Sequence, residues 1–152
     1  MRLGAAWVLV LLWTGPVQGP WFGTWKLNFE KSSSNGSDRR YKRMTLRIEP
    51  WQDGLRVIYD MVGPRGEVSH LEWTGKFDGR DYPVEGVDYV LTSAYSPVDD
   101  HAYQIAVKVD GTPAATTKVA ISADGKTLTT LTTEMNAQGQ KVTSTAVYDR
   151  VD

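Results

Sequence analysis

The chain of 152 residues contains no cysteine. This absence excludes disulfides, thiolate catalysis and cysteine-ligated zinc or iron–sulfur sites, so packing and hydrogen bonding alone must hold the fold. The chain also lacks a basic excess, because 17 Lys and Arg stand against 18 Asp and Glu, for a formal net charge of −1. Nucleic-acid-binding domains normally carry such an excess, so no nucleic acid is expected as a partner.

Long hydrophobic runs are scarce, and the longest is too short to span a bilayer. Ala5–Trp13 is apolar and follows the basic residue Arg2, whereas a membrane-spanning helix needs about 20 apolar residues. This pattern is typical of a secretory signal peptide. We predict a signal peptide over residues 1–19 and one domain over 20–152, secreted or periplasmic and without a stable membrane span after cleavage. An uncleaved signal anchor is the alternative, because Pro20 would directly follow the cut.

Helical periodicity is absent from every window of ten or more residues. Segments of alternating polarity are separated instead by turn dipeptides such as Asp53-Gly54, Asp78-Gly79 and Asp124-Gly125, which reach the positive φ that tight hairpins require. Since no gap could hold a crossover helix, the strands must pair mostly antiparallel. The pattern predicts nine strands: Gly23–Asn28, Arg43–Glu49, Leu55–Met61, Glu67–Phe77, Val87–Tyr95, His101–Val109, Ala115–Ile121, Lys126–Glu134 and Lys141–Arg150.

Nine strands in an open sheet would expose long edges, and closure into a barrel removes them. We therefore predict an all-β fold, a single antiparallel up-and-down β-barrel of about 8–10 strands and monomeric, with a two-sheet sandwich as the alternative. Glu30–Arg40 is expected to be a polar loop that contains the glycosylation sequon Asn35-Gly36-Ser37. Asp78–Gly86 is expected to be a compact turn around Tyr82-Pro83.

Both ends of the predicted domain resemble the calycin group, which comprises lipocalins and intracellular fatty-acid-binding proteins. Phe22–Leu27 is similar to their first-strand Gly-x-Trp signature, through Gly23 and Trp25, and Val147–Val151 is similar to their closing strand. The resemblance implies a lipocalin-like barrel in which Arg150 covers the Trp25 indole, a favourable cation–π contact. A wider set of segments resembles a family of uncharacterised secreted bacterial lipocalin-like proteins: Gly23–Asn28, Lys31-Ser32, Lys76–Gly79, Asp81–Pro83, Asp124–Leu128 and Val147-Tyr148.

Two features depart from the fatty-acid-binding pattern. Those proteins carry a helix–turn–helix lid after the first strand, and Glu30–Arg40 is too short and too polar to form one. Their closing strand holds the ligand carboxylate with an Arg-x-Tyr pair, and the matching positions here are Ala146 and Tyr148. Because the tyrosine is kept and the cation is not, tight carboxylate capture of that kind is not expected.

The inner faces of the strands are the best candidate for a functional site. Six Trp and seven Tyr are a heavy aromatic load, and aromatic side chains line apolar pockets as well as filling cores. The expected ligand-binding residues are Tyr59, Met61, Trp73, Tyr89, Tyr103 and Tyr148. We therefore predict a secreted protein that carries or sequesters a small hydrophobic molecule. A barrel filled by its own side chains, acting through its surface as an interaction or inhibitor protein, is the alternative.

Catalytic and metal-binding patterns are weak. His70 and His101 are the only histidines, and His70-x-Glu72 would place two potential metal ligands on one face of a strand. Nothing in the sequence brings His101 to them, and no Gly-x-Ser-x-Gly elbow occurs. No catalytic residue, metal site or cofactor is therefore predicted. An enzyme that uses His70 and Glu72 inside the lumen remains the third functional alternative.

Overall fold

The computed structural model describes residues 19–34 and 41–152. These residues form ten β-strands and no helix, which confirms the all-β prediction. The described part of the chain therefore holds no helical segment that could cross a membrane. The strands are β1 (Gly23–Ser34), β2 (Arg43–Trp51), β3 (Gly54–Val62), β4 (Val68–Lys76), β5 (Tyr82–Glu85), β6 (Leu91–Asp99), β7 (Ala102–Val109), β8 (Thr112–Ile121), β9 (Thr127–Met135) and β10 (Lys141–Arg150).

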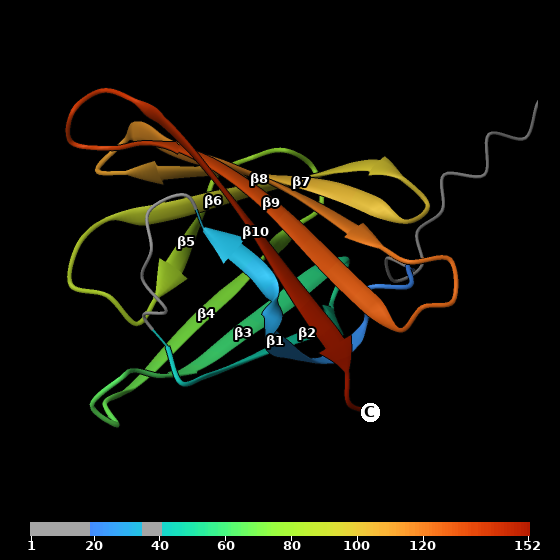
Figure 1. Ribbon diagram of the computed structural model, residues 1–152. Helices are drawn as coiled ribbons and strands as arrows, with labels where there is room; N and C mark the ends of the chain where they lie inside the picture. The colour runs from blue at the N-terminus through green and yellow to red at the C-terminus, as the bar shows by residue number, and fades with distance from the viewer. Residues whose placement is uncertain (1–18, 35–40) are drawn as a thin grey trace, which may run out of the picture.

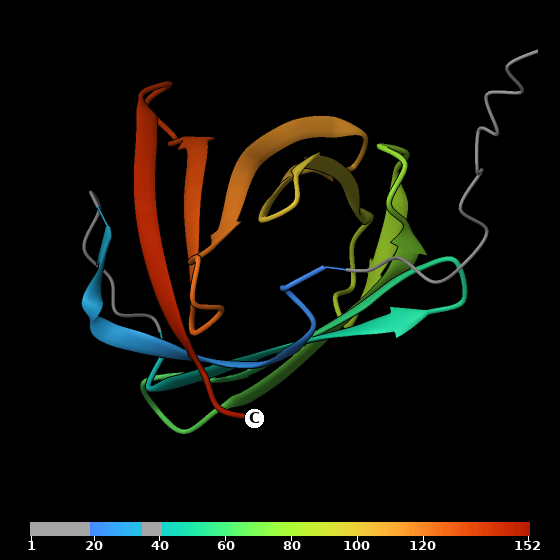
Figure 2. The ribbon, with the colours of Figure 1, turned by 90° about the vertical axis from the view of Figure 1, so that its right-hand side faces the viewer.

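All ten strands belong to one closed antiparallel barrel. Each strand pairs with the next in sequence, and β1 pairs with β10 to complete the ring (Figure 1). In Figure 2, β7 and β8 arch over the opposite wall formed by β2–β4. The prediction of a single up-and-down barrel is therefore confirmed, and the sandwich alternative was wrong. Closure pairs every strand on both sides, which shortens the open edges at which another chain could pair.

The largest error of the sequence prediction lies between β4 and β6. The segment expected to be a compact turn contains a short strand, β5, which pairs through two residues with each neighbour. The strand predicted over Val87–Tyr95 was wrong in its first half, because the backbone bends after Gly86 and β6 begins only at Leu91. Gly86 has φ +111, in the left-handed region that favours glycine, so the chain turns there.

The first strand is longer than expected. The polar loop predicted from Glu30 was wrong in its first part, since β1 continues to Ser34. A bulge between Asn28 and Ser33 shifts the pairing of β1 with β10. The Ser32 hydroxyl bridges it by donating to the Asn28 carbonyl (2.7 Å) and accepting from the Val147 amide (3.0 Å). The predicted sequon and residues 1–18 of the predicted signal peptide lie outside the described residues.

One end of the barrel is packed by aromatic rings. Trp21 lies 5.5 Å from Phe77 and 5.4 Å from Tyr103 between ring centroids, and Tyr103 lies 5.6 Å from Tyr95. The Trp25 indole is fully buried, and its Nε1–H donates to the Trp21 carbonyl at 2.9 Å. We call this region the packed end. Edge-to-face and offset contacts of this kind stabilise beyond the area they bury.

Arg150 closes the packed end from outside. Its guanidinium carbon lies 4.2 Å from the centre of the Trp25 ring. The same group donates to the backbone carbonyls of Pro20 (2.6 Å), Phe22 (2.8 Å) and Gly125 (2.7 Å). Gly23 has φ +142, and a Cβ there would collide with the guanidinium. The first-strand glycine is thus required both for its backbone angle and for the arginine to fit.

Candidate functional site

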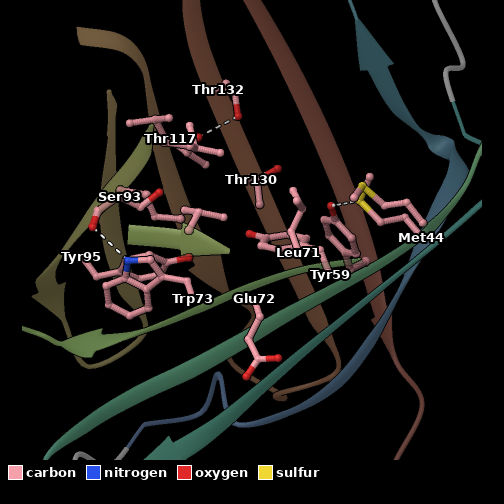
Figure 3. Close-up of a pocket in the computed structure, with 16 residues that line it drawn as sticks. Met44, Tyr59, Leu71, Glu72, Trp73, Ser93, Tyr95, Thr117, Thr130 and Thr132 are labelled. Carbon is pink, nitrogen blue, oxygen red and sulfur yellow. Dashed lines mark hydrogen bonds between the residues drawn. The ribbon is translucent and has the colours of Figure 1, made fainter. Parts of the chain in front are cut away.

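A cavity of about 310 Å³ occupies the barrel interior beyond the packed end (Figure 3). Along several strands, the inward residues at one end are closely packed, whereas those at the other end border the cavity. On β3, Leu55 and Val57 are fully buried in the core, whereas Tyr59 and Met61 line the cavity. The lining residues are Met44, Tyr59, Met61, Leu71, Glu72, Trp73, Val84, Leu91, Ser93, Tyr95, Ile105, Val107, Thr117, Thr130, Thr132 and Tyr148.

One wall of the cavity is aliphatic. Strands β2 to β6 contribute Met44, Met61, Leu71, Val84 and Leu91. Successive side chains of a strand point to opposite faces, and these residues lie on the faces that the pleat directs to the inside of the ring. Unbranched Met side chains adapt to the shape of what they touch. This wall, which we call the aliphatic wall, suits the apolar part of a ligand.

The opposite wall carries hydroxyl groups. Thr117 on β8 stands directly across from Thr132 on β9 in the sheet register, and their Oγ1 atoms lie 2.9 Å apart in a hydrogen bond. Thr130 lies two residues before Thr132 and therefore on the same face of β9. Figure 3 shows all three side chains at the cavity. We call Thr117, Thr130 and Thr132 the threonine wall.

Three buried phenols also line the cavity: Tyr59, Tyr95 and Tyr148. Burial raises the pKa of Tyr59, Tyr95 and Tyr148, with the pKa of Tyr95 well above its usual range. The Tyr148 hydroxyl donates to Met44 Sδ at 3.1 Å. Because burial disfavours the charged phenolate, these groups are neutral hydroxyls at physiological pH. They can donate or accept hydrogen bonds but supply no counter-charge.

Four of the six residues predicted to bind ligand line the cavity: Tyr59, Met61, Trp73 and Tyr148. Trp73 does so with its indole N–H already donating to the Ser93 carbonyl at 3.0 Å. Tyr103 lies deeper, where it is buried in the packed end. Tyr89 lies in the bend before β6 with 48% of its surface exposed. Its predicted inward position was wrong because the strand begins two residues later.

The His70 and Glu72 pair lies on the outside of the barrel. The Glu72 side chain points away from the cavity (Figure 3) and pairs with Arg56 at 2.7 Å. His70 Nδ1 lies 2.6 Å from Asp60 Oδ1, and this hydrogen bond is the main reason that the His70 pKa is raised. The interpretation that these residues work inside the lumen was therefore wrong. Within ranges 19–34 and 41–152, no three His, Asp or Glu side chains form a metal-binding group.

The threonine wall was missed by the sequence prediction. The segment Thr127–Met135 contains threonine on both faces, and its two leucines lie on opposite faces. Leu128 is fully buried and Leu131 is 40% exposed. Alternation alone therefore could not show which threonines face inward. The available signal was sequence separation from Leu128. Had Leu128 been identified as the core residue, Thr130 and Thr132, two and four residues further on, would have been predicted on the same inward face.

Comparison with known proteins supports the fold. The barrel is similar to that of zebrafish ileal bile acid-binding protein complexed with cholic acid, with a TM-score of 0.54 and 16% sequence identity, over 88% of this chain and 100% of that one. Two sequences of the secondary metabolism regulator LAE1 from Hypocrea atroviridis, one from strain ATCC 20476 / IMI 206040, are 33% identical over 67 residues, 43% of this chain. The chain spans about a fifth (19%) of that regulator. No family model matches. The structural likeness supports the closed β-barrel fold.

Proposed function

We propose that this protein carries or sequesters a small hydrophobic molecule in the lumen of its barrel. The observation that carries the proposal is the cavity of about 310 Å³ between the aliphatic and threonine walls. Ligand pockets commonly range from about 300 to 1,000 Å³, with apolar walls and a few placed polar groups. A cavity of this size is equivalent to roughly ten water molecules, which suits a compact ligand. The similar zebrafish barrel, solved with cholic acid, supports the same use.

The filled-barrel alternative is not supported by this interior. Protein interiors are close-packed, and large voids cost stability through lost contacts. The packed end shows that this chain can fill a barrel with aromatic rings. The space beside it therefore favours a lumen that accepts a molecule over one that only supports an outer surface.

Titration with Nile red, an uncharged dye that fluoresces in apolar surroundings, tests the proposal. We expect saturable one-to-one binding to the wild-type chain. Val107→Phe, on the cavity wall, should fill the space and weaken dye binding at least about tenfold, a difference of 1.4 kcal/mol. Leu131→Phe is the matched control, since Leu131 lies on the outer face of the barrel. No saturable binding to the wild type, or equal loss in both variants, would refute the lumen as the site.

We further propose that residues 1–19 direct secretion of the barrel to the periplasm or the extracellular space. The basic start and the short apolar core support this, because both are typical of a signal peptide. Expression of the full chain beside a version that begins at Pro20 tests the idea. We expect the full chain alone to be exported, with a new N-terminus near Pro20 by mass spectrometry. Retention of both inside the cell would contradict secretion.

A further inference from the structure

The cavity presents hydroxyl groups but no cation. Among the described residues that line it, none is Lys, Arg or His, and the carboxylate of Glu72 points outward. Ala146, at the position where the calycin resemblance implies a cation, packs against the hydrophobic core. Two residues beyond Thr132 on the same face of β9 stands Glu134, exposed toward the end of the strand. A ligand that entered with a negative charge would find no cationic partner among the described residues that line the cavity.

The energetic consequence follows from burial. An ionised carboxylate taken into an apolar space without a paired charge loses its hydration, and the effective penalty is several kcal/mol. The phenols of the same cavity experience this penalty, because burial raises the pKa of Tyr59 and Tyr95 and keeps both neutral. A hydroxyl or carbonyl pays a smaller penalty, and threonine hydroxyls can rotate to donate to it or accept from it.

We propose that the cavity selects an uncharged amphipathic molecule, such as a medium-chain alcohol or another neutral lipid, and discriminates against the matching carboxylate. The polar group of the ligand binds at the threonine wall, and its apolar part lies against the aliphatic wall. This inference rests on the proposed function, since it concerns the chemical class that the same lumen accepts. The proposed preference for uncharged ligands is the opposite of the preference for carboxylates that a buried arginine would give.

Competition against bound Nile red with decanol and decanoate, at neutral pH and below the critical micelle concentration, tests the inference. The two probes have equal chain length and differ in the charge of the head group. We expect decanol to bind about tenfold or more tightly, and decanoate to gain affinity when the pH is lowered enough to protonate it. Equal or tighter binding of decanoate at neutral pH would overturn the inference. Displacement by neither probe, with Nile red still bound, would overturn it while leaving the proposed function intact. If Nile red itself does not bind, both fall.

Two threonines on β9 offer a matched pair of variants. Thr130→Val removes a hydroxyl from the cavity with little change of shape, whereas Thr129→Val removes one from the outer face of the same strand. Since a hydrogen bond contributes about 1 kcal/mol net, we expect Thr130→Val to weaken decanol binding about fivefold and Thr129→Val to leave it unchanged. Equal affinities for the two variants would remove the threonine wall from the inference.

A variant of Lys42 tests the competing possibility that the ligand head group binds at the rim of the barrel. This residue directly precedes β2 and is exposed, so a carboxylate held at the rim could pair with it. If Lys42→Gln leaves the preference for decanol over decanoate unchanged, the selection arises inside the cavity, as proposed. If wild-type decanoate binding is strong and Lys42→Gln abolishes it, the head group lies at the rim, and the inference is overturned.

Discussion

The packed end and the cavity of this barrel are made by the same strands but differ in how closely the inward side chains are packed. On β3, Leu55 and Val57 are fully buried, and the next two inward residues, Tyr59 and Met61, border open space. On β9, Leu128 is fully buried, while Thr130 borders the cavity. Close packing and open space are therefore divided along the barrel axis, so substitutions at the two places should have different effects.

The largest expected effect is at the packed end. Trp25→Ala removes a fully buried indole together with its hydrogen bond to Trp21 and its contact with Arg150. Such a truncation costs about 3–5 kcal/mol, a large part of the stability of a small domain. Urea unfolding followed by circular dichroism measures it. A loss below about 1 kcal/mol would break the division between the two regions.

Arg150→Lys sharpens the same comparison with a smaller change. Lysine keeps the charge but lacks the planar fork that reaches the carbonyls of Pro20, Phe22 and Gly125 together. We expect a loss of about 1–3 kcal/mol in urea unfolding, because partly buried acceptors are left without donors. Arg47→Lys, on the exposed face of β2, is the control and should change stability by less than about 0.5 kcal/mol. Equal effects would show that the three-carbonyl contact contributes nothing.

Truncation at the cavity should cost much less. Leu91→Ala shortens a side chain that already borders empty space, so fewer packing contacts are lost than in a filled core. We expect a loss of about 1 kcal/mol, which differential scanning calorimetry can compare with Trp25→Ala. Nile red binding to Leu91→Ala should persist. A loss as large as that of Trp25→Ala would mean that the cavity wall stabilises the fold as strongly as the packed end does.

The smallest expected effect on stability comes from the titration of His70 on the outer surface. Hydrogen bonds to Asp60 and then Glu72 raise the pKa of His70 above its ordinary value of 6.5. The contribution to stability is therefore fully present below pH 6.5 and is lost as the pH rises through the raised, folded-state pKa. NMR titration of the ring protons should show the raised pKa, and Asp60→Asn should lower it. Ligand affinity should not change through this titration, since His70 lies outside the barrel; a parallel change would contradict that separation.

Sequence alternation predicted the barrel because most strands have apolar residues on one face only. In the strand predicted over Leu55–Met61, alternate residues share one face, and the structure places Leu55, Val57, Tyr59 and Met61 inward. Prediction failed at β5, where four residues including Pro83 are too few to show a period and pair with neighbours only briefly. It failed at Tyr89 because the alternation from Val87 was interpreted as strand, whereas the chain bends over residues 86–89 and β6 begins at Leu91.

The cavity itself could not be predicted from alternation. An inward residue has the same pattern whether it is packed or borders a void, as Leu55 and Met61 show on one strand. The difference depends on how much volume the residues across the ring supply, and these come from strands far apart in sequence. The contact between Trp25 and Arg150 was predicted from the family resemblance alone. Their positions differ by 125 residues, so no local pattern in the sequence could have shown that they meet.

The pairing of β1 with β10 has a consequence for how the protein is made. The first strand leaves the ribosome long before its partner β10. The carbonyls of Pro20 and Phe22 accept from the Arg150 guanidinium, which lies 130 and 128 residues further along the chain and is synthesised last. Until the last strand is synthesised, β1 and β9 each keep an unpaired edge, a surface on which other nascent chains could add. Such long-range closure makes folding slow relative to local structure. A nascent chain that stalls before Lys141 would thus remain an open, aggregation-prone sheet, and synthesis of β10 is the step that ends this exposure.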